Sequence, residues 1–291
     1  MNLVEYLARA TEYLDRHQVT SPRLNAEVML ANMLGISRVQ VYTSFERVLT
    51  PGEAGAYRDF VMRRAGGVPL QYITGETGFR GLVLETREGV FIPRPETEIL
   101  VEKALEKSAG VPGGRTVRVL DVGTGCGNIA LAIASELEEA RVLAVDCSRE
   151  AVELCARNAG RLGLEGRVRV ALSDFYDCLG EGDRFDLVVS NPPYIPEGMR
   201  GRLPREVEEH EPERALFAGP EGMDAIRRIT AGAPGHLVPG GWLVLEVDES
   251  HAGRVGEELT ESGWTGVEVF EDLCGRPRVV CAKRGVDVAE D

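Results

Sequence analysis

The residues Asn191-Pro192-Pro193-Tyr194 follow the apolar run 185–190, which has the pattern of a buried strand. Neither proline has an N–H for a strand ladder, and Pro192 also keeps Asn191 out of the helical conformation. We therefore expect an extended corner at the carboxyl edge of a sheet, where open α/β sheets bind ligands. A planar amide or amine can donate its two N–H bonds to the Asn191 side-chain oxygen and the Pro192 carbonyl, under the Tyr194 ring. The alternative is a proline-rich turn without chemistry.

A second candidate site follows the apolar run 117–122, where a glycine-rich turn precedes a helical pattern. Glycines let the backbone approach a ligand at the N-terminus of a helix. Asn128 stands where a dinucleotide fingerprint has its third glycine, so the turn favours a smaller group than a pyrophosphate. The predicted cofactor-binding residues of this turn are Gly123, Thr124, Gly125, Cys126 and Gly127.

Two further strand ends carry carboxylates. Asp146 ends the apolar run 142–145, where a carboxylate can hold both hydroxyls of a ribose. Asp174 and Phe175 follow the next run, 168–172, and can bind the amine and the face of an adenine. Each carboxylate alone could be a helix cap. Together the three strand ends predict a nucleoside site, and S-adenosylmethionine fits it better than NAD.

The bulk composition is that of a globular protein. The chain has 291 residues, of which 43% are hydrophobic and 27% charged, and no apolar stretch is long enough for a membrane span. The N-terminus lacks the pattern of a signal peptide, so we expect a cytoplasmic protein. Its six cysteines and four histidines show no zinc spacing, and we expect no metal.

The net charge of −14 lies wholly in residues 86–291, because residues 1–85 carry equal numbers of basic and acidic side chains. A protein that binds a phosphate backbone is expected to carry a basic surface. The charge therefore disfavours direct binding of nucleic acid.

The chain divides into four predicted parts: a helical bundle over 1–67, a β-hairpin linker over 68–95, an α/β domain over 96–285 and an acidic tail over 286–291. The pattern after Thr116 alternates strand and helix, as in a parallel sheet. In the bundle, Ser21 is predicted to cap a helix that starts at Pro22 and ends at Gly35. Its predicted buried residues are Leu24, Val28, Ala31 and Leu34.

The linker ends in Ile92-Pro93-Arg94-Pro95-Glu96-Thr97-Glu98, and Pro95 suits the first turn of a helix. Arg94 lies just outside that turn. It can reach a substrate carbonyl or carboxylate, which makes it a candidate substrate-binding residue. The structural alternative is an ion pair with Glu96 or Glu98.

These segments carry a resemblance. Asp121–Gly127, Asp146 and Asn191–Tyr194 resemble a class I S-adenosylmethionine-dependent methyltransferase that modifies a planar nitrogen. The chain is similar to the narrower PrmC/HemK family over nearly its whole length. The matching segments are Gln71–Gly75, Ile92–Glu98, Val189-Ser190, Ile195, Glu211-Pro212, Ala215-Leu216 and Gly275–Arg278.

The resemblance implies a Rossmann-like fold with a mostly parallel seven-stranded sheet and helices on both faces, together with a helical N-terminal domain that helps to dock the substrate. It implies N5-methylation of the glutamine in the Gly-Gly-Gln loop of class 1 peptide chain release factors. Asn191, Pro192 and Tyr194 would then be catalytic, Asp121 and Asn191 would also contact the cofactor, and Pro193 would contact the substrate. We expect a monomer.

The sequence departs from the family pattern at two places. Phe175 stands where tryptophan is frequent, and an aromatic ring can still stack there. Val247, Asp248 and His251 replace the usual glycine and glutamine after Leu245-Glu246, which leaves the role of that loop open.

Three other functions remain as alternatives. An N6-adenine methyltransferase of DNA or RNA can use the same corner, but the charge and the scarcity of lysine disfavour it. An NAD-dependent oxidoreductase is disfavoured by Asn128. A binding module that has kept the cofactor fold would bind the cofactor without turnover.

Overall fold

The computed structural model describes residues 1–44, 46–111 and 115–285. The chain forms two compact units. The helical unit comprises residues 1–76, 86–88 and 201–211, and the α/β unit comprises 77–85, 89–200 and the chain from Pro212 onward. The predicted acidic tail, 286–291, lies outside the described residues.

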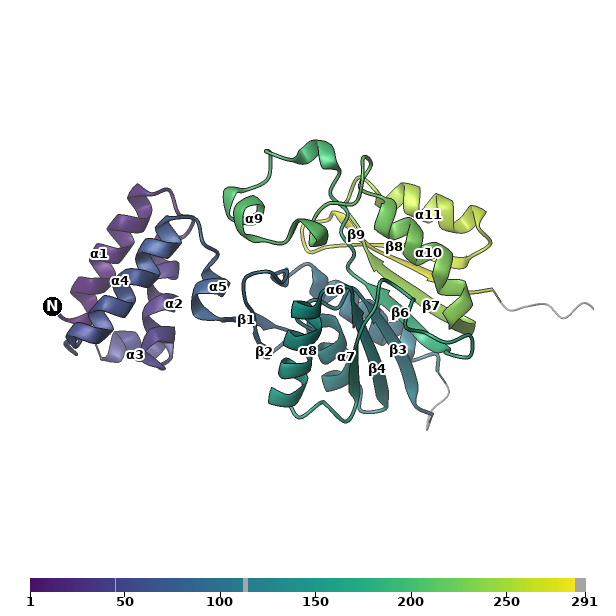
Figure 1. Ribbon diagram of the computed structural model, residues 1–291, viewed down its shortest axis with the longest axis horizontal. Helices are drawn as coiled ribbons and strands as arrows, with labels where there is room; N and C mark the ends of the chain where they lie inside the picture. Colours follow the sequence, from purple (N-terminus) through teal and green to yellow (C-terminus); the bar gives the residue numbers. More distant parts are fainter. Residues whose placement is uncertain (45, 112–114, 286–291) are drawn as a thin grey trace, which may run out of the picture. The chain divides into compact units, whose positions relative to one another are not determined.

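The helical unit contains six helices among the described residues (Figure 1). They are α1 (Leu3–Arg16), α2 (Pro22–Leu34), α3 (Arg38–Thr43), α4 (Pro51–Ala65), α5 (Leu70–Thr74) and α9 (Arg205–His210). The side chains of Asn2 and Thr50 each accept a hydrogen bond from the backbone three residues later, and Glu5 and Glu53 return the bond. These two capping boxes fix where α1 and α4 begin.

The predictions for this unit are wrong in three details, although Ala31 is buried and Gly35 ends α2 as predicted. Ser21 lies in the left-handed region, with φ of 51°, and its side chain makes no capping bond, although Pro22 does begin α2. The buried face of α2 consists of Asn25, Ala26, Glu27, Met29, Leu30 and Ala31, whereas Leu24 is exposed. The face of α2 that packs against α1 and α4 therefore includes polar side chains. The linker predicted over 68–95 does contain a hairpin, β1 (Glu76–Phe79) and β2 (Leu82–Glu85), but residues 70–74 before it form helix α5.

A buried arginine joins separate segments of the helical unit. Arg64 of α4 donates to the side-chain oxygen of Asn25 at 2.7 Å and to the carbonyl of Val68 at 3.0 Å. Its remaining terminal nitrogen lies 2.7 Å from a carboxylate oxygen of Glu206 in α9. Since a buried guanidinium needs such partners, α9 is bound to this unit although it follows β6 (Phe185–Ser190) of the α/β unit in the sequence.

The α/β unit is built on a seven-stranded sheet in the order β5-β4-β3-β6-β7-β9-β8. Neighbouring strands are parallel except at β9, which runs antiparallel to β7 and β8. The predicted fold class is confirmed. The strands are β3 (Val117–Val122), β4 (Ala140–Asp146), β5 (Val168–Leu172), β6 (Phe185–Ser190), β7 (Leu237–Glu246), β8 (Thr265–Glu271) and β9 (Pro277–Lys283), and a separate hairpin joins β1 (Glu76–Phe79) to β2 (Leu82–Glu85).

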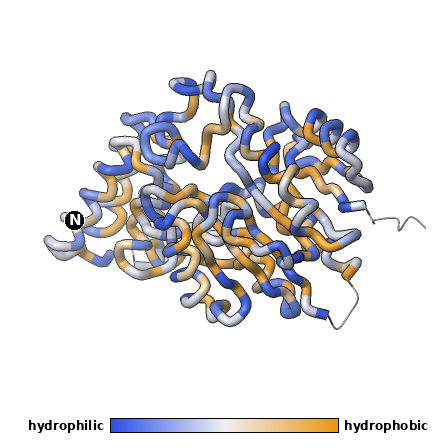
Figure 2. The backbone as a smooth tube through the Cα atoms, turned by 45° about the vertical axis from the view of Figure 1, so that its right-hand side comes forward, coloured by the Kyte–Doolittle hydropathy of each residue, from blue (hydrophilic) through white to orange (hydrophobic). Residues whose placement is uncertain are grey.

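Helices cover both faces of the sheet (Figure 1). One face packs against α6 (Thr97–Ser108), α7 (Asn128–Glu136) and α8 (Arg149–Arg161), and the other against α10 (Asp224–His236) and α11 (Ala252–Glu261). The central strands β3 and β6 are almost entirely buried, because both faces of the sheet are covered there. Hydrophobic residues, orange in Figure 2, run through the middle of the tube. Two short 3₁₀ helices, Glu197–Met199 and Glu213–Ala215, lie between β6 and α10.

The strand register brings the predicted site segments to one edge. Asp146 pairs with Leu172, Val122 with Val145, and Asp121 with Val189. Because these strands are parallel, the residues that follow them share the carboxyl edge. The glycine turn after β3 therefore lies between Asp146 on one side and Asn191 on the other.

Candidate active site

The Asn191 corner starts immediately after β6 and has no regular secondary structure over residues 191–194. The hydroxyl of Ser190 donates to the carbonyl of Val122 at 2.6 Å, which fixes the end of β6 against the end of β3. Pro192 is buried, whereas Asn191 and Tyr194 are partly exposed. The corner is thus rigid and accessible.

The side-chain amide of Asn191 has a defined partner. Its Nδ2 donates to the Thr97 hydroxyl at 3.1 Å. Among the described residues, no protein group donates to Asn191 Oδ1 or to the Pro192 carbonyl. Two acceptors therefore remain in the described part of the chain, and their role in binding an amide stays a prediction.

Tyr194 is held at both ends. Its hydroxyl donates to Oε1 of Glu246 at 3.3 Å, and burial raises the pKa of the phenol. A Cβ at Gly222 would come 2.3 Å from the Tyr194 carbonyl, so only glycine allows this approach. Because the ring packs partly against the apolar cluster under α10, its position is set by the fold.

The glycine turn adopts backbone conformations that other residues rarely reach. Gly123, Gly125 and Gly127 have φ of 77°, 57° and 91°. A Cβ at Gly127 would also come 2.7 Å from Sγ of Cys155 and 2.9 Å from Cδ1 of Leu131. The turn therefore needs these glycines for its shape, and α7 begins directly behind it. Cys126 of this turn is fully buried, so its side chain supports the turn from within.

Asp121 is fully buried at the end of β3. Its Oδ2 accepts the Thr124 hydroxyl at 2.7 Å, whereas Oδ1 is a buried acceptor without a partner among the described residues. Burial raises the pKa of this carboxyl to about 7. An unpaired buried carboxylate oxygen is costly, which is typical of a functional position.

Asp146 shapes the same turn from the neighbouring strand. Its Oδ2 accepts the N–H of Gly125 at 2.9 Å and its Oδ1 accepts the N–H of Ser148 at 2.8 Å. Burial raises the pKa of Asp146, and these two bonds oppose the shift. Each carboxylate oxygen has a further lone pair, so Asp146 can still accept hydroxyl groups.

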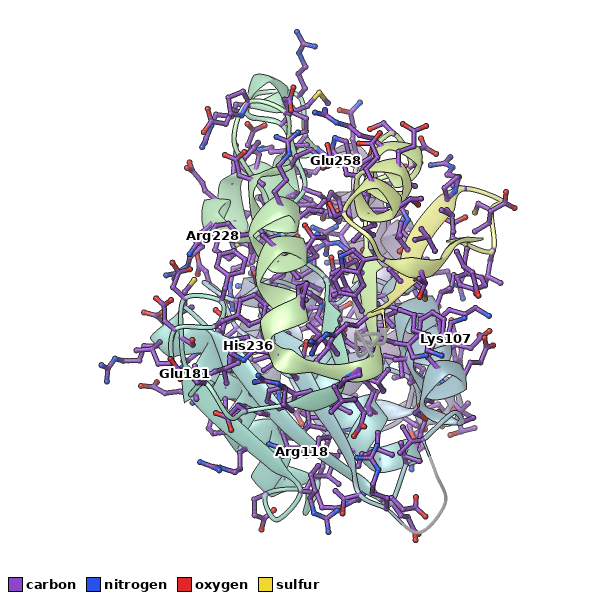
Figure 3. All side chains as sticks on the ribbon, turned by 90° about the vertical axis from the view of Figure 1, so that its right-hand side faces the viewer. Lys107, Arg118, Glu181, Arg228, His236 and Glu258 are labelled. Atoms are coloured by element: carbon purple, nitrogen blue, oxygen red, sulfur yellow. The ribbon has the colours of Figure 1, made fainter. Side chains whose placement is uncertain are left out.

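Asp174 and Phe175 both contact Arg228 of α10, which is labelled in Figure 3. The guanidinium lies 2.8 Å from Oδ2 of Asp174 and 4.1 Å from the centre of the Phe175 ring. Phe175 has φ of 51°, which is strained for an aromatic residue. Asp174 and Phe175, the predicted adenine-binding pair, therefore lie next to each other, but both are already in contact with Arg228.

Arg94 lies with its guanidinium 4.7 Å from the centre of the Phe91 ring. Glu98, one of the two predicted partners of Arg94, accepts the N–H of Arg80 at 2.9 Å. A role for Arg94 in substrate binding remains a prediction.

Sequence reasoning did not select Thr97 or Glu246. Thr97 lies in Ile92–Glu98, one of the segments that resemble the family. Glu246 ends an apolar strand, as Asp146 does. Since Ser190 pairs with Leu245, the next residues, Asn191 and Glu246, are neighbours. The position of the Glu246 carboxylate at the end of a strand is the sequence signal that could have identified this residue.

The loop that departs from the family pattern is tightly built. Val247 is fully buried, and Asp248 accepts the N–H of Ser250 at 3.0 Å. His251 is buried, and its Nδ1 has no hydrogen bond among the described residues. A Cβ at Gly222 would come 3.0 Å from the His251 ring, so this histidine packs close to the Tyr194 segment.

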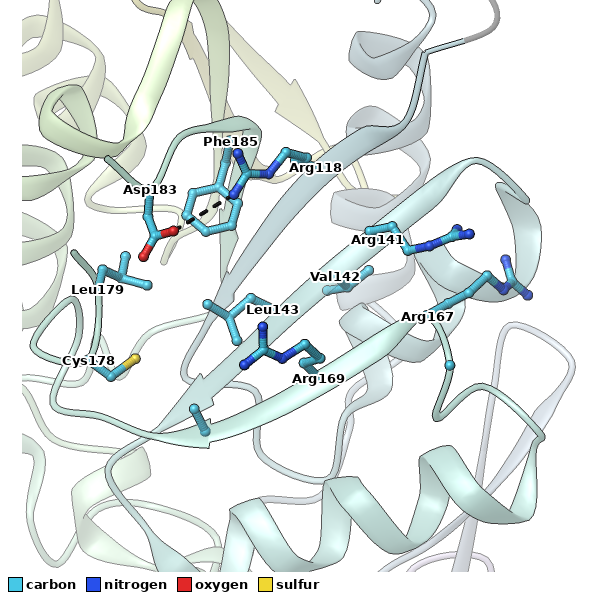
Figure 4. Close-up of a pocket in the computed structure, with 12 residues that line it drawn as sticks. Arg118, Arg141, Val142, Leu143, Arg167, Arg169, Cys178, Leu179, Asp183 and Phe185 are labelled. Carbon is cyan, nitrogen blue, oxygen red and sulfur yellow. Dashed lines mark ion pairs between the residues drawn. The ribbon is translucent and has the colours of Figure 1, made fainter. Parts of the chain in front are cut away.

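A separate groove, shown in Figure 4, lies toward the amino ends of β3, β4 and β5. Arg118, Arg141, Arg167 and Arg169 contribute to its lining, and Arg118 lies 3.9 Å from Asp183. None of the predicted site residues lines it. In the described part of the chain, no helix has the length and apolarity of a membrane span, and no cluster of metal-ligand side chains occurs.

Comparison with known proteins gives two domain matches. Residues 5–75 match the PrmC N-terminal domain, and residues 84–202 match the methyltransferase small domain. A release factor glutamine methyltransferase of Koribacter versatilis is 41% identical over 286 residues, which cover 98% of this chain and 99% of the relative. This chain belongs to the release factor glutamine methyltransferase family.

Other members of the family are similarly close. The release factor glutamine methyltransferase of Deinococcus radiodurans is 40% identical over 98% of this chain and 99% of its own. That of Rhodopirellula baltica is 37% identical over 98% and 96%. The similarity to these relatives therefore extends over both units of this chain.

Solved structures of more distant proteins share the fold. A human methyltransferase 10 domain containing protein has a TM-score of 0.53 at 18% identity, covering 70% of this chain and 88% of that one. A T. thermophilus 16S rRNA methyltransferase, in complex with AdoMet and guanosine, has a TM-score of 0.52 at 22% identity, covering 72% and 49%. These similarities support the class I methyltransferase fold of this family member.

Proposed function

We propose that this chain methylates the side-chain nitrogen of the glutamine in the Gly-Gly-Gln motif of class 1 peptide chain release factors, with S-adenosylmethionine as methyl donor. Family membership at about 40% identity over nearly the whole chain supports the activity. The structural observation that carries the proposal is the pair of open acceptors at Asn191 and Pro192, beside the glycine turn.

The residues of the glycine turn fit S-adenosylmethionine. Asp121 offers a buried oxygen without a partner, and Asp146 offers lone pairs at the end of β4. The turn bends through three glycines in front of α7, whose N-terminus favours a carboxylate. Asp146 would hold the ribose hydroxyls of the cofactor. The glycine turn would hold its amino-acid portion, and Asp174 and Phe175 would hold its adenine.

The corner acts on the substrate amide. When bound, S-adenosylmethionine supplies an electrophilic methyl group on a positively charged sulfur. A glutamine nitrogen is a poor nucleophile because its lone pair is delocalised into the carbonyl. Asn191 Oδ1 and the Pro192 carbonyl would accept its two N–H bonds and direct the nitrogen at the methyl group. Positioning of this kind is worth roughly 7–11 kcal/mol in well-oriented cases.

The same acceptors favour the positive charge that develops on the nitrogen, because they are fixed before the reaction starts. Tyr194 would cover the flat face of the amide. The nitrogen would gain the methyl group and release one proton to water, with S-adenosylhomocysteine left as the other product. Arg94 would bind the backbone of the substrate loop.

The helical unit would contact the release factor, since its sequence matches the N-terminal domain of the family and lacks a catalytic group of its own. The substrates take part in translation, so we place the protein in the cytoplasm, acting as a monomer. The net charge of −14 supports a protein substrate over a nucleic acid.

Transfer of a labelled methyl group tests this function. The protein is incubated with labelled S-adenosylmethionine and either a purified release factor or adenine-containing duplex DNA. We expect label in the release factor alone. Label in the DNA alone would support the N6-adenine alternative, and binding of the cofactor with no labelled product would support a binding module.

A further inference from the structure

Thr97 lies between two other side chains of the site. It is the first residue of α6 and is fully buried. Its hydroxyl accepts a hydrogen bond from Asn191 Nδ2 at 3.1 Å, and it lies close enough to the carboxyl group of Glu246 to lower the pKa of that group. The three side chains therefore form one polar cluster behind the corner.

The hydroxyl of Thr97 accepts from Asn191 Nδ2 and has one hydrogen of its own to donate. An ionised carboxylate can only accept, so the neighbouring Glu246 favours a hydroxyl that points this hydrogen toward it. Thr97 can then only accept from the Asn191 amide, which must turn its NH₂ inward. The amide oxygen consequently faces outward, where the substrate nitrogen needs an acceptor.

Glu246 also holds Tyr194. Its Oε1 accepts the Tyr194 hydroxyl at 3.3 Å, and its backbone follows β7 directly beside Asn191. Its Oε2 is buried without a hydrogen bond among the described residues. One buried carboxylate is thus connected to two residues of the corner.

We propose that Thr97 and Glu246 are positioning residues, which orient the Asn191 amide and the Tyr194 ring so that the corner presents its acceptor oxygen to the substrate. This inference rests on the proposed function for its catalytic consequence. Neither residue needs to touch the substrate.

The orientation depends on the ionisation of Glu246. Burial raises the pKa of this carboxyl to about 7, and Thr97, Arg278 and Tyr194 oppose the shift while Glu96 adds to it. Arg278 lies 3.6 Å from Asp272 and also faces Asp248. A protonated Glu246 can donate to Thr97, and the Asn191 amide then loses its fixed direction. Orientation is therefore present above pH 7 and lost as the pH falls through 7.

Paired variants of Thr97 separate the hydroxyl from the volume it fills. Thr97→Val removes the hydroxyl and keeps the shape, and Thr97→Ser keeps the hydroxyl. We expect Thr97→Val to lower kcat on release factor by about 10–100-fold, as for loss of one buried hydrogen bond in a network. KM and the cofactor Kd should stay within about twofold, and Thr97→Ser should keep kcat within about threefold. Equal kcat in Thr97→Val and the unmodified protein would overturn the inference.

The pH profile tests Glu246. In the unmodified protein kcat should fall as the pH is lowered from 8 to 6, with a midpoint near 7. In Glu246→Gln, kcat should be lower and its acidic limb shallower, because Glu246 no longer titrates whereas Asp121, whose pKa is also raised to about 7, still does. An acidic limb that persists unchanged in Glu246→Gln would contradict the role of this carboxylate.

A spectroscopic measurement is independent of the substrate. The side-chain NH₂ signals of Asn191 are identified in ¹⁵N-labelled protein by their disappearance in Asn191→Ala. We expect slow hydrogen exchange at these signals, and faster exchange with a changed shift in Thr97→Val. Unchanged signals would overturn the inference. If release factor is not methylated at all, the proposed function fails, and this result still decides the orientation.

Discussion

Asp146 shapes the glycine turn and is also the residue that we propose to hold the ribose hydroxyls of the cofactor. Its two oxygens accept backbone N–H groups from the glycine turn and from the residue before α8. Its position at the end of a strand was sufficient to select it from the sequence. Its backbone partners were not predictable, because they depend on how the turn after β3 folds back.

Replacing Asp146 by alanine should weaken binding of S-adenosylmethionine by about 10–100-fold, since hydrogen bonds to charged groups are worth about 1.5–3 kcal/mol. Isothermal titration calorimetry measures the effect. Asp183→Ala is the matched control, because that carboxylate lies at the groove near Arg118. Equal losses in both variants would contradict a direct role for Asp146.

At the scale of the elements, the sequence predicted most of the α/β unit. Apolar runs such as 117–122 and 185–190 became strands because both faces of the sheet are buried. The prediction failed where packing overrides local pattern, as on α2, where Asn25 is buried by its bond to Arg64 and Leu24 is exposed. The sequence-based prediction also did not include Thr97 and Glu246, because contacts between segments that are distant in the chain leave no local pattern in the sequence.

The glycine turn gives a prediction for an element boundary. Gly127→Ala should destabilise the protein by about 1–3 kcal/mol, because the added Cβ strains a positive φ and meets Cys155 and Leu131. Urea denaturation measures the change. The control is Gly160→Ala in α8, where a Cβ meets nothing within 4 Å and alanine should be neutral or stabilising. A neutral Gly127→Ala would show that the turn tolerates a side chain.

At the scale of the whole molecule, the chain passes between its two units more than once. Residues 201–211 leave the α/β unit and belong to the helical unit, where Glu206 pairs with the buried Arg64. No local sequence pattern indicates this pairing, because the two residues are far apart along the chain.

Two units with separate cores predict two unfolding transitions. Scanning calorimetry with S-adenosylmethionine at 100 times its Kd should stabilise the α/β unit by about 2.7 kcal/mol and leave the helical unit unchanged. Tyr57→Phe removes the bond from a buried hydroxyl to the Ala26 carbonyl and should lower only the helical transition, by about 1 kcal/mol. A single transition that responds to both changes would mean one cooperative unit.

The most direct test of the account is mass spectrometry of a release factor after incubation with S-adenosylmethionine and either the unmodified protein or Asn191→Ala. We predict one added methyl group on the glutamine of the Gly-Gly-Gln motif with the unmodified protein. In Asn191→Ala the rate should fall by about 10²–10³-fold, comparable to removing one fixed group from a charge-stabilising site, while cofactor binding is retained. An unmodified glutamine in the first reaction, or a near-normal rate in the second, would contradict it.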